Sequence, residues 1–385
     1  MVGAISIRSV GTEQDFLALR SEWNDLLRRS PIDSVFLRHE WFEAAWEWWR
    51  SDCQLHILCA YRDQDLVGIC PLVCRAYDMG AIRVRAVKFL TVPDSQMIDF
   101  IGPTTDRHAV CEAVVAYLVD NRCDWELIEL EKIPTESDTL APLLNALSKR
   151  GVLATVYDDG SNPGIDLTDT WQSYYSRRSR RLKKGNNLVR NRLERAHQNI
   201  ELKRCSEKNI EHIDVNQCLG QLINISSKSW KKDTGLTLEQ PNPNAFIRKL
   251  TQRALEQGWL SAWFLWLDGV AVAMEYQLDY HGKIHALRAD YDEAFAEQSP
   301  GTYLNHELLK LLFESNSKRY LMGPGKNPYK LRWAEEFEPL SRVVGYNTNL
   351  KGRLLGITKL KLIPWIKRFQ RRGEKLVARG KRDSQ

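Results

Sequence analysis

Two stretches far apart in this chain share one pattern of residues. The first is Leu55-His-Ile-Leu-Cys-Ala-Tyr-Arg-Asp-Gln-Asp-Leu-Val-Gly-Ile69, and the second is Leu260-Ser-Ala-Trp-Phe-Leu-Trp-Leu-Asp-Gly-Val-Ala-Val-Ala273. Each begins with an apolar run typical of a strand, passes an acidic turn and enters a second strand of small and branched residues. A repeated strand–turn–strand unit favours an internal duplication. We therefore expect two related α/β units on one chain.

The hydrophobic pattern predicts a similar plan of elements in each half. The expected helices cover 13–29 with Thr12 as N-cap, 39–49, 106–120, 136–150, 176–197, 210–230, 244–257 and 303–315. The expected strands cover 55–62, 66–75, 83–90, 97–101, 125–131, 152–157, 259–267, 270–280, 283–290 and a short run just before Gly323. Because Asp158-Asp-Gly-Ser-Asn-Pro-Gly164 is rich in turn residues, we expect a linker over 158–166. The predicted division is a domain over 1–160, a domain over 166–350 and a tail over 351–385.

Bulk properties limit the class of protein. With 385 residues, 43% of them hydrophobic, the chain can build two cores. The sequence shows no apolar run long enough for a membrane span and no signal-peptide pattern at its N-terminus, so we expect a cytoplasmic protein. The eight cysteines include no Cys-x-x-Cys pair, and we expect no metal site.

The net charge of +6 is distributed unevenly. Residues 177–204 carry eleven Lys and Arg against two acidic residues, and residues 351–385 carry twelve against two. The first segment predicts a cationic helix that can hold tRNA, a nucleotide-linked sugar or coenzyme A phosphates, or that is simply a solvated face. The tail mixes apolar, aromatic and basic residues, which suits either a helix on an anionic membrane surface or a helix packed on its own domain. The first of these interpretations predicts a location peripheral to the inner face of the membrane.

The segment Gln298-Ser-Pro-Gly-Thr-Tyr303 opens a predicted apolar helix. The start of a helix presents unpaired backbone N–H groups and the positive end of the helix dipole, which suits a phosphate. Gly301 permits close approach of a ligand, and Ser299 and Thr302 add hydroxyl groups. The alternative is an ordinary helix start with Ser299 as its N-cap.

A second segment, Gly323-Pro-Gly-Lys-Asn-Pro-Tyr-Lys330, follows the short predicted strand. Its glycines allow unusual backbone dihedral angles, and Lys326 and Lys330 bring positive charge to the loop. The alternative is a surface loop with solvated lysines.

The order of strand, Asp-Gly hairpin, third strand, Pro-Gly helix, short strand and Tyr-Lys loop resembles the GNAT acyltransferase fold. Residues 170–345 more narrowly resemble the acetyltransferase domain of the CelD-like group of cellulose and exopolysaccharide biosynthesis, relatives of the FemABX transferases. The resemblance implies two tandem GNAT-like domains with mixed, mainly antiparallel sheets, the second catalytic and the first a partner. It also implies acetyl-CoA, or another acyl-CoA, as co-substrate at Gln298, Ser299, Gly301 and Thr302. Tyr303 departs from the family pattern, which has a small residue at that position.

Acyl transfer to an amine needs a base for the proton of the nucleophile and a donor for the departing thiolate. Glu275 and Asp290, on the predicted central strands, are the candidate bases, and the residues leave the choice between them open. Tyr303 and Tyr329 are the candidate acids. The resemblance matches Tyr329-Lys330 to the acceptor site, where Lys330 can hold a phosphate of an activated sugar or stabilise an oxyanion.

The leading hypothesis is an acyl-CoA-dependent acyltransferase that transfers acetyl to an amine or hydroxyl of a sugar or cell-surface polysaccharide precursor, by direct attack on the thioester. Its expected partner is a small-molecule or nucleotide-linked sugar acceptor. One alternative is a Fem-type, aminoacyl-tRNA-dependent transferase, whose binding to RNA should weaken steeply with salt. Another is a catalytically silent, membrane-peripheral binding protein.

Overall fold

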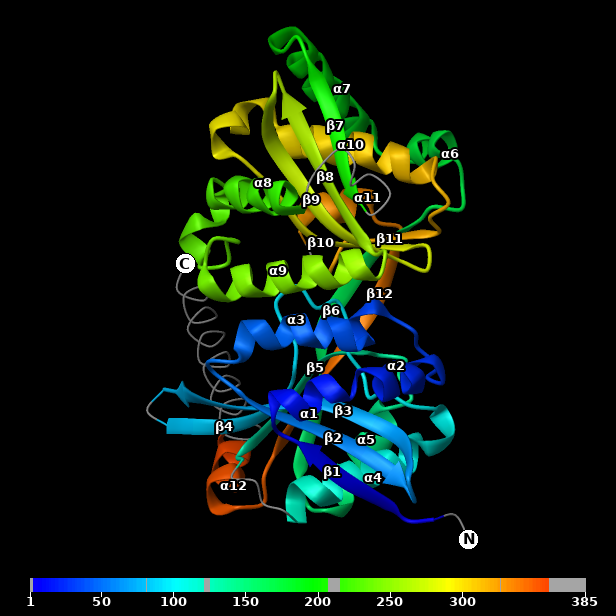
Figure 1. The fold of residues 1–385 in the computed structure, drawn as a ribbon, viewed down its shortest axis with the longest axis vertical. Helices are drawn as coiled ribbons and strands as arrows, with labels where there is room; N and C mark the ends of the chain where they lie inside the picture. The colour runs from blue at the N-terminus through cyan, green and yellow to red at the C-terminus, as the bar shows by residue number, and fades with distance from the viewer. Residues whose placement is uncertain (1–2, 81, 121–124, 207–214, 326, 360–385) are drawn as a thin grey trace, which may run out of the picture.

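The computed structural model describes residues 3–80, 82–120, 125–206, 215–325 and 327–359. At its centre is one mixed sheet of twelve strands in the order β1-β2-β3-β4-β5-β12-β6-β11-β10-β9-β8-β7, with helices in front of and behind it (Figure 1). The expected α/β class with mixed, mainly antiparallel pairing is confirmed. The two halves of the chain form the two ends of this sheet.

The elements have the following bounds. The strands are β1 (Ile5–Val10), β2 (Gln54–Arg62), β3 (Asp65–Met79), β4 (Ile82–Phe89), β5 (Leu127–Pro134), β6 (Leu153–Asp166), β7 (Ile200–Ser206), β8 (Leu260–Leu267), β9 (Val270–Tyr280), β10 (Lys283–Tyr291), β11 (Arg319–Leu321) and β12 (Glu336–Tyr346). The α-helices are α1 (Glu13–Ala18), α2 (Arg20–Arg28), α3 (His39–Trp49), α4 (Thr104–Asp120), α5 (Leu140–Lys149), α6 (Trp171–Ser176), α7 (Arg180–Ala196), α8 (Val215–Ser227), α9 (Pro241–Glu256), α10 (Pro300–Phe313), α11 (Pro328–Trp333) and α12 (Leu350–Ile357). Short 3-10 helices are η1 (Val35–Leu37), η3 (Trp230–Thr234) and η4 (Glu293–Gln298).

The strand pairing repeats in the two halves, as the duplicated sequence pattern predicts. β1 to β4 pair antiparallel in sequence order, and β4 pairs parallel with β5. β7 to β10 pair antiparallel in the same way, and β10 pairs parallel with β11. The sixth strands are exchanged, because β12 lies against β5 and β6 lies against β11. β6 and β12 also pair with each other, so the two half-sheets become one.

Several sequence-based expectations were wrong in detail. The turn-rich run at 158–166 is not a linker but lies within β6, where pairing with β12 and β11 holds it extended. Its turn residues are accommodated as an irregularity: Gly160 has a φ of 87°, and the register shifts opposite it between Pro339 and Ser341. Long-range pairing thus overrides local turn preference. The division into domains stays a prediction.

Other helices and strands differ at their boundaries. The helix expected over 13–29 is two helices joined at Leu19, although Thr12 does cap the first, its Oγ1 accepting from the N–H of Asp15 at 3.1 Å. The basic helix expected over 176–197 is interrupted between α6 and α7, and Ser179 caps α7. The strand expected over 97–101 is a loop with a single bridge, Ile69 to Ile101. Sequence patterns did not reveal β1, β7 or β12. Residues 210–214 of one expected helix, Lys326 and most of the tail lie outside the described residues.

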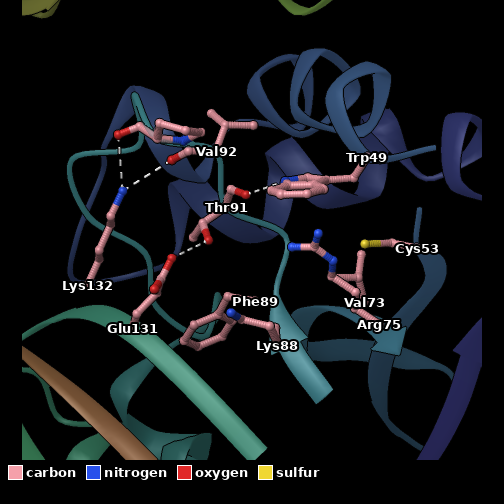
Figure 2. A pocket seen from close by; sticks show the side chains of 11 residues that line it. Trp49, Cys53, Val73, Arg75, Lys88, Phe89, Thr91, Val92, Glu131 and Lys132 are labelled. Carbon is pink, nitrogen blue, oxygen red and sulfur yellow. Dashed lines mark hydrogen bonds between the residues drawn. The ribbon is translucent and has the colours of Figure 1, made fainter. Parts of the chain in front are cut away.

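The parallel strands at the centre of each half separate at their carboxyl ends. β10 pairs with β11 only over Lys283–His285, and β4 pairs with β5 only over Ala86–Lys88. In the C-terminal half the Gly323 loop lies beyond the point of separation. In the N-terminal half this point borders a small pocket (Figure 2). Ligands of open α/β sheets bind in crevices of this kind.

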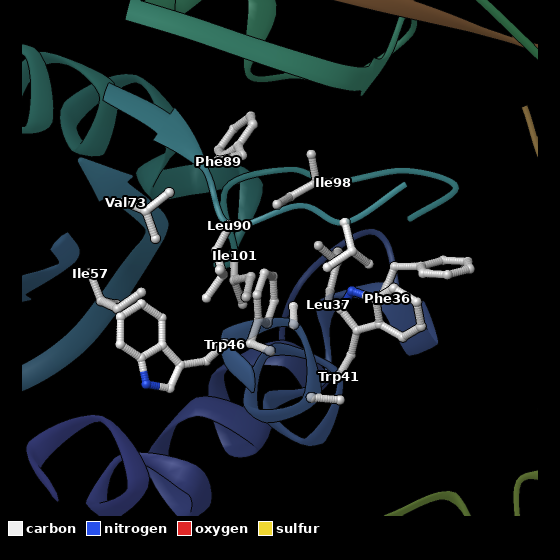
Figure 3. Close-up of a cluster of buried hydrophobic side chains, with 14 of the residues drawn as sticks. Phe36, Leu37, Trp41, Trp46, Ile57, Val73, Phe89, Leu90, Ile98 and Ile101 are labelled. Atoms are coloured by element: carbon white, nitrogen blue, oxygen red, sulfur yellow. The ribbon is translucent and has the colours of Figure 1, made fainter. Parts of the chain in front are cut away.

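The largest core cluster joins the two halves. Aromatic residues of η1 and α3 (Phe36, Trp41 and Trp46) pack against the sheet and the loop that follows β4 (Figure 3). Trp41 also meets Phe246 of α9 edge to face, with 5.5 Å between ring centroids. α3 and α9 therefore lie side by side at the middle of the molecule (Figure 1).

Candidate functional site

Glu275 is a buried carboxylate on β9, with 3% of its surface exposed. Its Oε1 accepts hydrogen bonds from the hydroxyl of Tyr320 at 2.6 Å and from Nε2 of Gln277 at 2.8 Å. Burial raises the pKa of Glu275, against the opposing effects of these two bonds and of the charge on Lys330. Its Oε2 has no hydrogen-bond partner among the described residues. A carboxylate with a raised pKa and a free oxygen can accept a proton near neutral pH.

Lys330 of α11 is also buried, and its ammonium group fixes the glycine loop. Its Nζ donates to the carbonyl oxygens of Gly323 at 2.9 Å and Pro324 at 3.2 Å. Burial, together with the charge of Lys231, lowers the pKa of Lys330 to about 8. A Cβ added to Gly323 would lie 3.4 Å from the carbonyl oxygen of Ala286 on β10, so the loop runs close to the strand where β10 and β11 separate.

Asp290 points to the opposite face of the sheet from Glu275. Ala289 is the partner of Glu275 across β9 and β10, and side chains alternate along a strand, so Asp290 projects the other way. Its Oδ1 lies 2.6 Å from Nζ of Lys231. The geometry therefore pairs Asp290 with a lysine and leaves Glu275 as the less neutralised candidate base.

The two candidate tyrosines have different surroundings. Tyr329 exposes 44% of its surface, yet burial of the hydroxyl end, with Glu275 and Asp290 nearby, raises its pKa. Tyr303 is half-buried in a hydrophobic cluster with Val189 and Leu193 of α7, and burial also raises its pKa. The charges of both candidate bases thus act on the hydroxyl of Tyr329, whereas Tyr303 packs between α7 and α10.

The start of α10 shows some, but not all, of the features expected of an anion-binding site. Ser299 has a left-handed backbone (φ 59°) and its side chain forms no capping hydrogen bond, contrary to the ordinary helix start considered from the sequence. No partner for the N–H of Gly301 is found within the described residues. The side chain of Gln298, however, is occupied: its Oε1 lies 2.6 Å from Nε2 of His197, at the end of α7. Gln298 thus anchors α7 to the segment before α10.

A groove of about 610 Å³ lies beside Thr302, between α7, α10 and α11. Arg181, Lys184 and Arg332 line it, and none of the three has an ion-pair partner among the described residues. Other cations of this region are paired: Arg190 with Glu307 at 2.6 Å, and both Arg177 and Arg178 with Glu335. Most cations of α7 thus have no ion-pair partner among the described residues, and Arg181 and Lys184 are those that line the groove next to the predicted phosphate-binding residues.

Sequence reasoning missed Tyr320, Gln277 and Gln96. Gln96, from the loop after β4, donates from Nε2 to the carbonyl oxygen of Ala286 at 2.8 Å, and its Oε1 lies 3.1 Å from Nδ1 of His285. The first half thereby contacts β10 directly beside the candidate site. The alternation of side chains along a strand places Gln277 on the same face as Glu275, so Gln277 could have been found from the sequence. No local signal in the sequence indicates that Tyr320 or Gln96 lies near Glu275.

In the C-terminal unit, the fourth strand β10 is thus followed by the start of α10 and by the cationic groove beside it. Residues 186–331 match the family of acetyltransferase (GNAT) domains. This part of the chain is a GNAT acetyltransferase domain. The family implies an acyl-CoA co-substrate.

Solved structures show the same fold over nearly the whole chain. FemX is similar with a TM-score of 0.55 and 10% identity, over 89% of this chain and 98% of that one. L-PGS from Bacillus licheniformis has a TM-score of 0.52 and 13% identity, over 94% and 99%. A conserved protein of unknown function from Bacteroides thetaiotaomicron has a TM-score of 0.51 and 12% identity, over 89% and 100%. No protein of curated function matches the sequence.

Two further properties concern only the part of the chain that the structure describes. None of its helices combines the length and the apolar character needed to cross a lipid bilayer. It also contains no group of three or more His, Cys, Asp or Glu side chains placed to hold a metal ion.

Proposed function

We propose that the C-terminal half transfers an acetyl group from acetyl-CoA to an amine or hydroxyl of a sugar or other precursor of cell-surface polysaccharide. The observation that carries the proposal is the groove beside Thr302, with three cations that lack acidic partners. A nucleotide phosphate is the natural counter-ion for such a set.

The groove fits a coenzyme A nucleotide in size and charge. Its volume of about 610 Å³ falls within the range of roughly 300–1,000 Å³ that is usual for small-molecule sites. Arg181, Lys184 and Arg332 would hold the phosphates, and the N–H of Gly301 and the hydroxyl of Thr302 would complete the site. Bound there, acyl-CoA supplies an acyl group activated as a thioester.

The residues of this chain then have distinct tasks in a direct transfer. Glu275 takes the proton of the acceptor amine or hydroxyl on its free Oε2, because burial keeps its affinity for a proton high. Tyr320 and Gln277 position it by holding Oε1. Lys330 fixes the glycine loop, and Tyr329, half-exposed nearby, is the proposed proton donor.

A Fem-type transfer from aminoacyl-tRNA is the second candidate. The likeness to FemX over 98% of that chain favours it, since the two folds share both halves and not the catalytic unit alone. The cations of α7 would then contact RNA phosphates.

The tail is proposed to dock on an anionic membrane surface. Leu350, Leu354 and Ile357 of α12 are 90%, 62% and 47% exposed, and Lys351 and Arg353 lie between them in the sequence. Deletion of residues 351–385 should abolish sedimentation with anionic vesicles and spare acetyl-CoA binding. If the shortened protein still sediments, the tail does not anchor it.

Calorimetric titration with acetyl-CoA at low and high salt tests the main proposal. We expect the double variant Arg181→Gln/Lys184→Gln to bind about tenfold or more weakly, and to lose part of the salt dependence. Arg180→Gln is the matched control, because Arg180 belongs to the same helix but does not line the groove. If the double variant binds acetyl-CoA as tightly as the wild type does, coenzyme A does not bind in this groove. If the wild type binds uncharged tRNA but not acetyl-CoA, transfer from aminoacyl-tRNA replaces acetyl transfer as the proposed function.

A further inference from the structure

The pocket in the N-terminal half lies where the two parallel strands of that half separate. Lys88 and Glu129 are the last residue pair between β4 and β5. Beyond them the loop after β4 and the end of β5 diverge, and the pocket opens between them with α3 and β3 as further walls (Figure 2). In the duplicated plan this is the counterpart of the β10–β11 separation beside Lys330. The pocket therefore stands at a position where this fold can hold a ligand.

Hydrogen bonds fix the walls of this pocket. The indole Nε1 of Trp49 donates to the carbonyl oxygen of Thr91 at 2.6 Å, and Oγ1 of Thr91 donates to Oε1 of Glu131 at 2.8 Å. Nζ of Lys132 donates to the carbonyl oxygens of Val92 at 3.1 Å and Pro93 at 3.3 Å (Figure 2). A ligand would thus meet a preorganised site, and its binding would not have to order these side chains.

Two opposite charges without ion partners face each other across the hollow. The guanidinium of Arg75 lies 4.5 Å from the ring centroid of Trp49, and it forms no ion pair within the described residues. Oε2 of Glu131, on the other side, has no hydrogen-bond partner among them. Lys88 is already neutralised by Glu129 at 2.9 Å. The ammonium of Lys132 has no ion partner either, but its three hydrogen bonds, to the carbonyl oxygens of Val92, Pro93 and Ser95, occupy its donors. The pocket therefore presents one cation with unused donors, Arg75, and one available carboxylate oxygen.

Size restricts the ligand to a small molecule. The volume is about 170 Å³, below the roughly 300 Å³ at which drug-sized sites begin. An acyl-CoA or a nucleotide is too large to enter, so the pocket is not a second acyl-CoA site.

We propose that this pocket binds a small zwitterion, with its carboxylate or phosphate on Arg75 and its ammonium on Glu131. Arg75 suits either anion because a guanidinium presents several N–H donors in one plane. The unpaired oxygen of Glu131 suits a positively charged donor opposite it. The assignment does not depend on the acetyl transfer proposed for the other half.

Calorimetric titration of the full chain with O-phosphoethanolamine, inorganic phosphate and ethanolamine tests the assignment. We expect O-phosphoethanolamine to bind at least tenfold more tightly than inorganic phosphate. Arg75→Gln should weaken the binding of O-phosphoethanolamine tenfold or more. Glu131→Gln should reduce the affinity for O-phosphoethanolamine to that for inorganic phosphate. Arg83→Gln, at an exposed position of β4 away from the pocket, is the control and should change nothing. Melting temperatures would show that each variant is folded.

Cysteine labelling gives a readout that needs no variant. Cys53 lines the pocket, whereas Cys74 points to the other face of β3 from Val73 and Arg75. Millimolar O-phosphoethanolamine should slow the reaction of Cys53 with a methanethiosulfonate, measured by peptide mass spectrometry, and leave Cys74 unchanged. The proposal would be overturned if O-phosphoethanolamine gave neither a heat of binding in the titration nor protection of Cys53 from labelling. It would also be overturned if Arg75→Gln left the binding intact. Equal affinity for phosphate and O-phosphoethanolamine would overturn the role of Glu131.

Discussion

Burial and hydrogen bonding act in opposite directions on Glu275. Burial favours the protonated form, while the hydroxyl of Tyr320 and the amide of Gln277 favour the carboxylate. Because both donors use Oε1, they orient the side chain without occupying Oε2. This arrangement is what a general base needs. Asp290 differs, because it lies beside the ammonium of Lys231 and neither of its oxygens is oriented by a hydrogen bond among the described residues.

Replacement of Glu275 by Gln should lower kcat by about 100- to 10,000-fold, the usual contribution of a general base, with a smaller effect on KM. The amide oxygen can still accept from Tyr320, so the fold should persist. Release of free coenzyme A thiol with a panel of amine and hydroxyl acceptors measures the rate. If Asp290→Asn reduces kcat more than Glu275→Gln does, Asp290 is the base instead.

At the scale of the element, the starts of α4 and α10 are equivalent positions with different surroundings. A Cβ on Gly102, just before α4, would lie 2.5 Å from the carbonyl oxygen of Val67, and its φ is 141°. The guanidinium of Arg107 also fills this helix start, donating to the carbonyl oxygens of Phe100 and Gly102. A Cβ added to Gly301 in α10 would meet the ring of Tyr291 at 3.4 Å, an ordinary contact. The first helix start is thus closed by its own chain, and the second has room beside it.

We expect Gly102→Ala to destabilise the protein by about 2–4 kcal/mol, because the methyl group meets a backbone oxygen in a conformation that favours glycine. Gly301→Ala is the matched substitution and should change stability by less than about 1 kcal/mol, since it makes an ordinary contact in the first turn of a helix. Denaturant unfolding measures both. Equal losses would mean that the two helix starts are packed alike.

At the scale of the whole molecule, the halves are joined by the exchanged strands β6 and β12 and by α3 against α9 (Figure 1). Glu43 of α3 is the charged centre of the second contact. Its Oε2 accepts from Nε of Arg253 on α9 at 2.8 Å, and its Oε1 lies close to Arg20 and His39. Burial raises the pKa of Glu43, but the hydrogen bond from His39 and the charges of His39, Arg253 and Arg20 outweigh it and bring the pKa to about 2.

Glu43→Gln should therefore cost about 3 kcal/mol at neutral pH, the value of a shift from 4.5 to about 2. The pKa is lower in the folded protein than in the unfolded chain, so the stabilisation is complete above about pH 4.5 and is lost as the pH falls toward 2. Unfolding free energies at several pH values should fall less steeply in the variant over this window. Glu47→Gln, on the same helix with an exposed arginine partner, is the control and should cost less than about 1 kcal/mol. A slope unchanged by Glu43→Gln would contradict the assignment.

The sequence by itself determined the local elements and the class of fold. Apolar periodicity located most helices and strands, and the repeated strand–turn–strand pattern predicted two similar units, because both signals arise between residues close in the chain. The order of motifs from Asp268-Gly269 to Lys330 also resembles that of the GNAT family, and this resemblance implied the family. Glu275 was also identified as a candidate from the sequence, since a lone charge among apolar residues is a local feature, but the sequence left open whether its side chain faces inward.

The tertiary structure alone decided how distant segments meet. β6 is extended in spite of its turn residues because β12 and β11 supply its hydrogen bonds from far along the chain. The hydroxyl of Tyr320 reaches Glu275, and Gln96 reaches β10, only because the sheet brings three separate segments together. The choice between Glu275 and Asp290 likewise depends on the register of β9 against β10, which places the two carboxylates on opposite faces. Pairing between segments far apart in the chain is set by long-range contacts, which leave no mark on local sequence. The register of the β9–β10 hairpin also depends on an irregularity between Ala286 and Arg288 that alternation alone does not reveal.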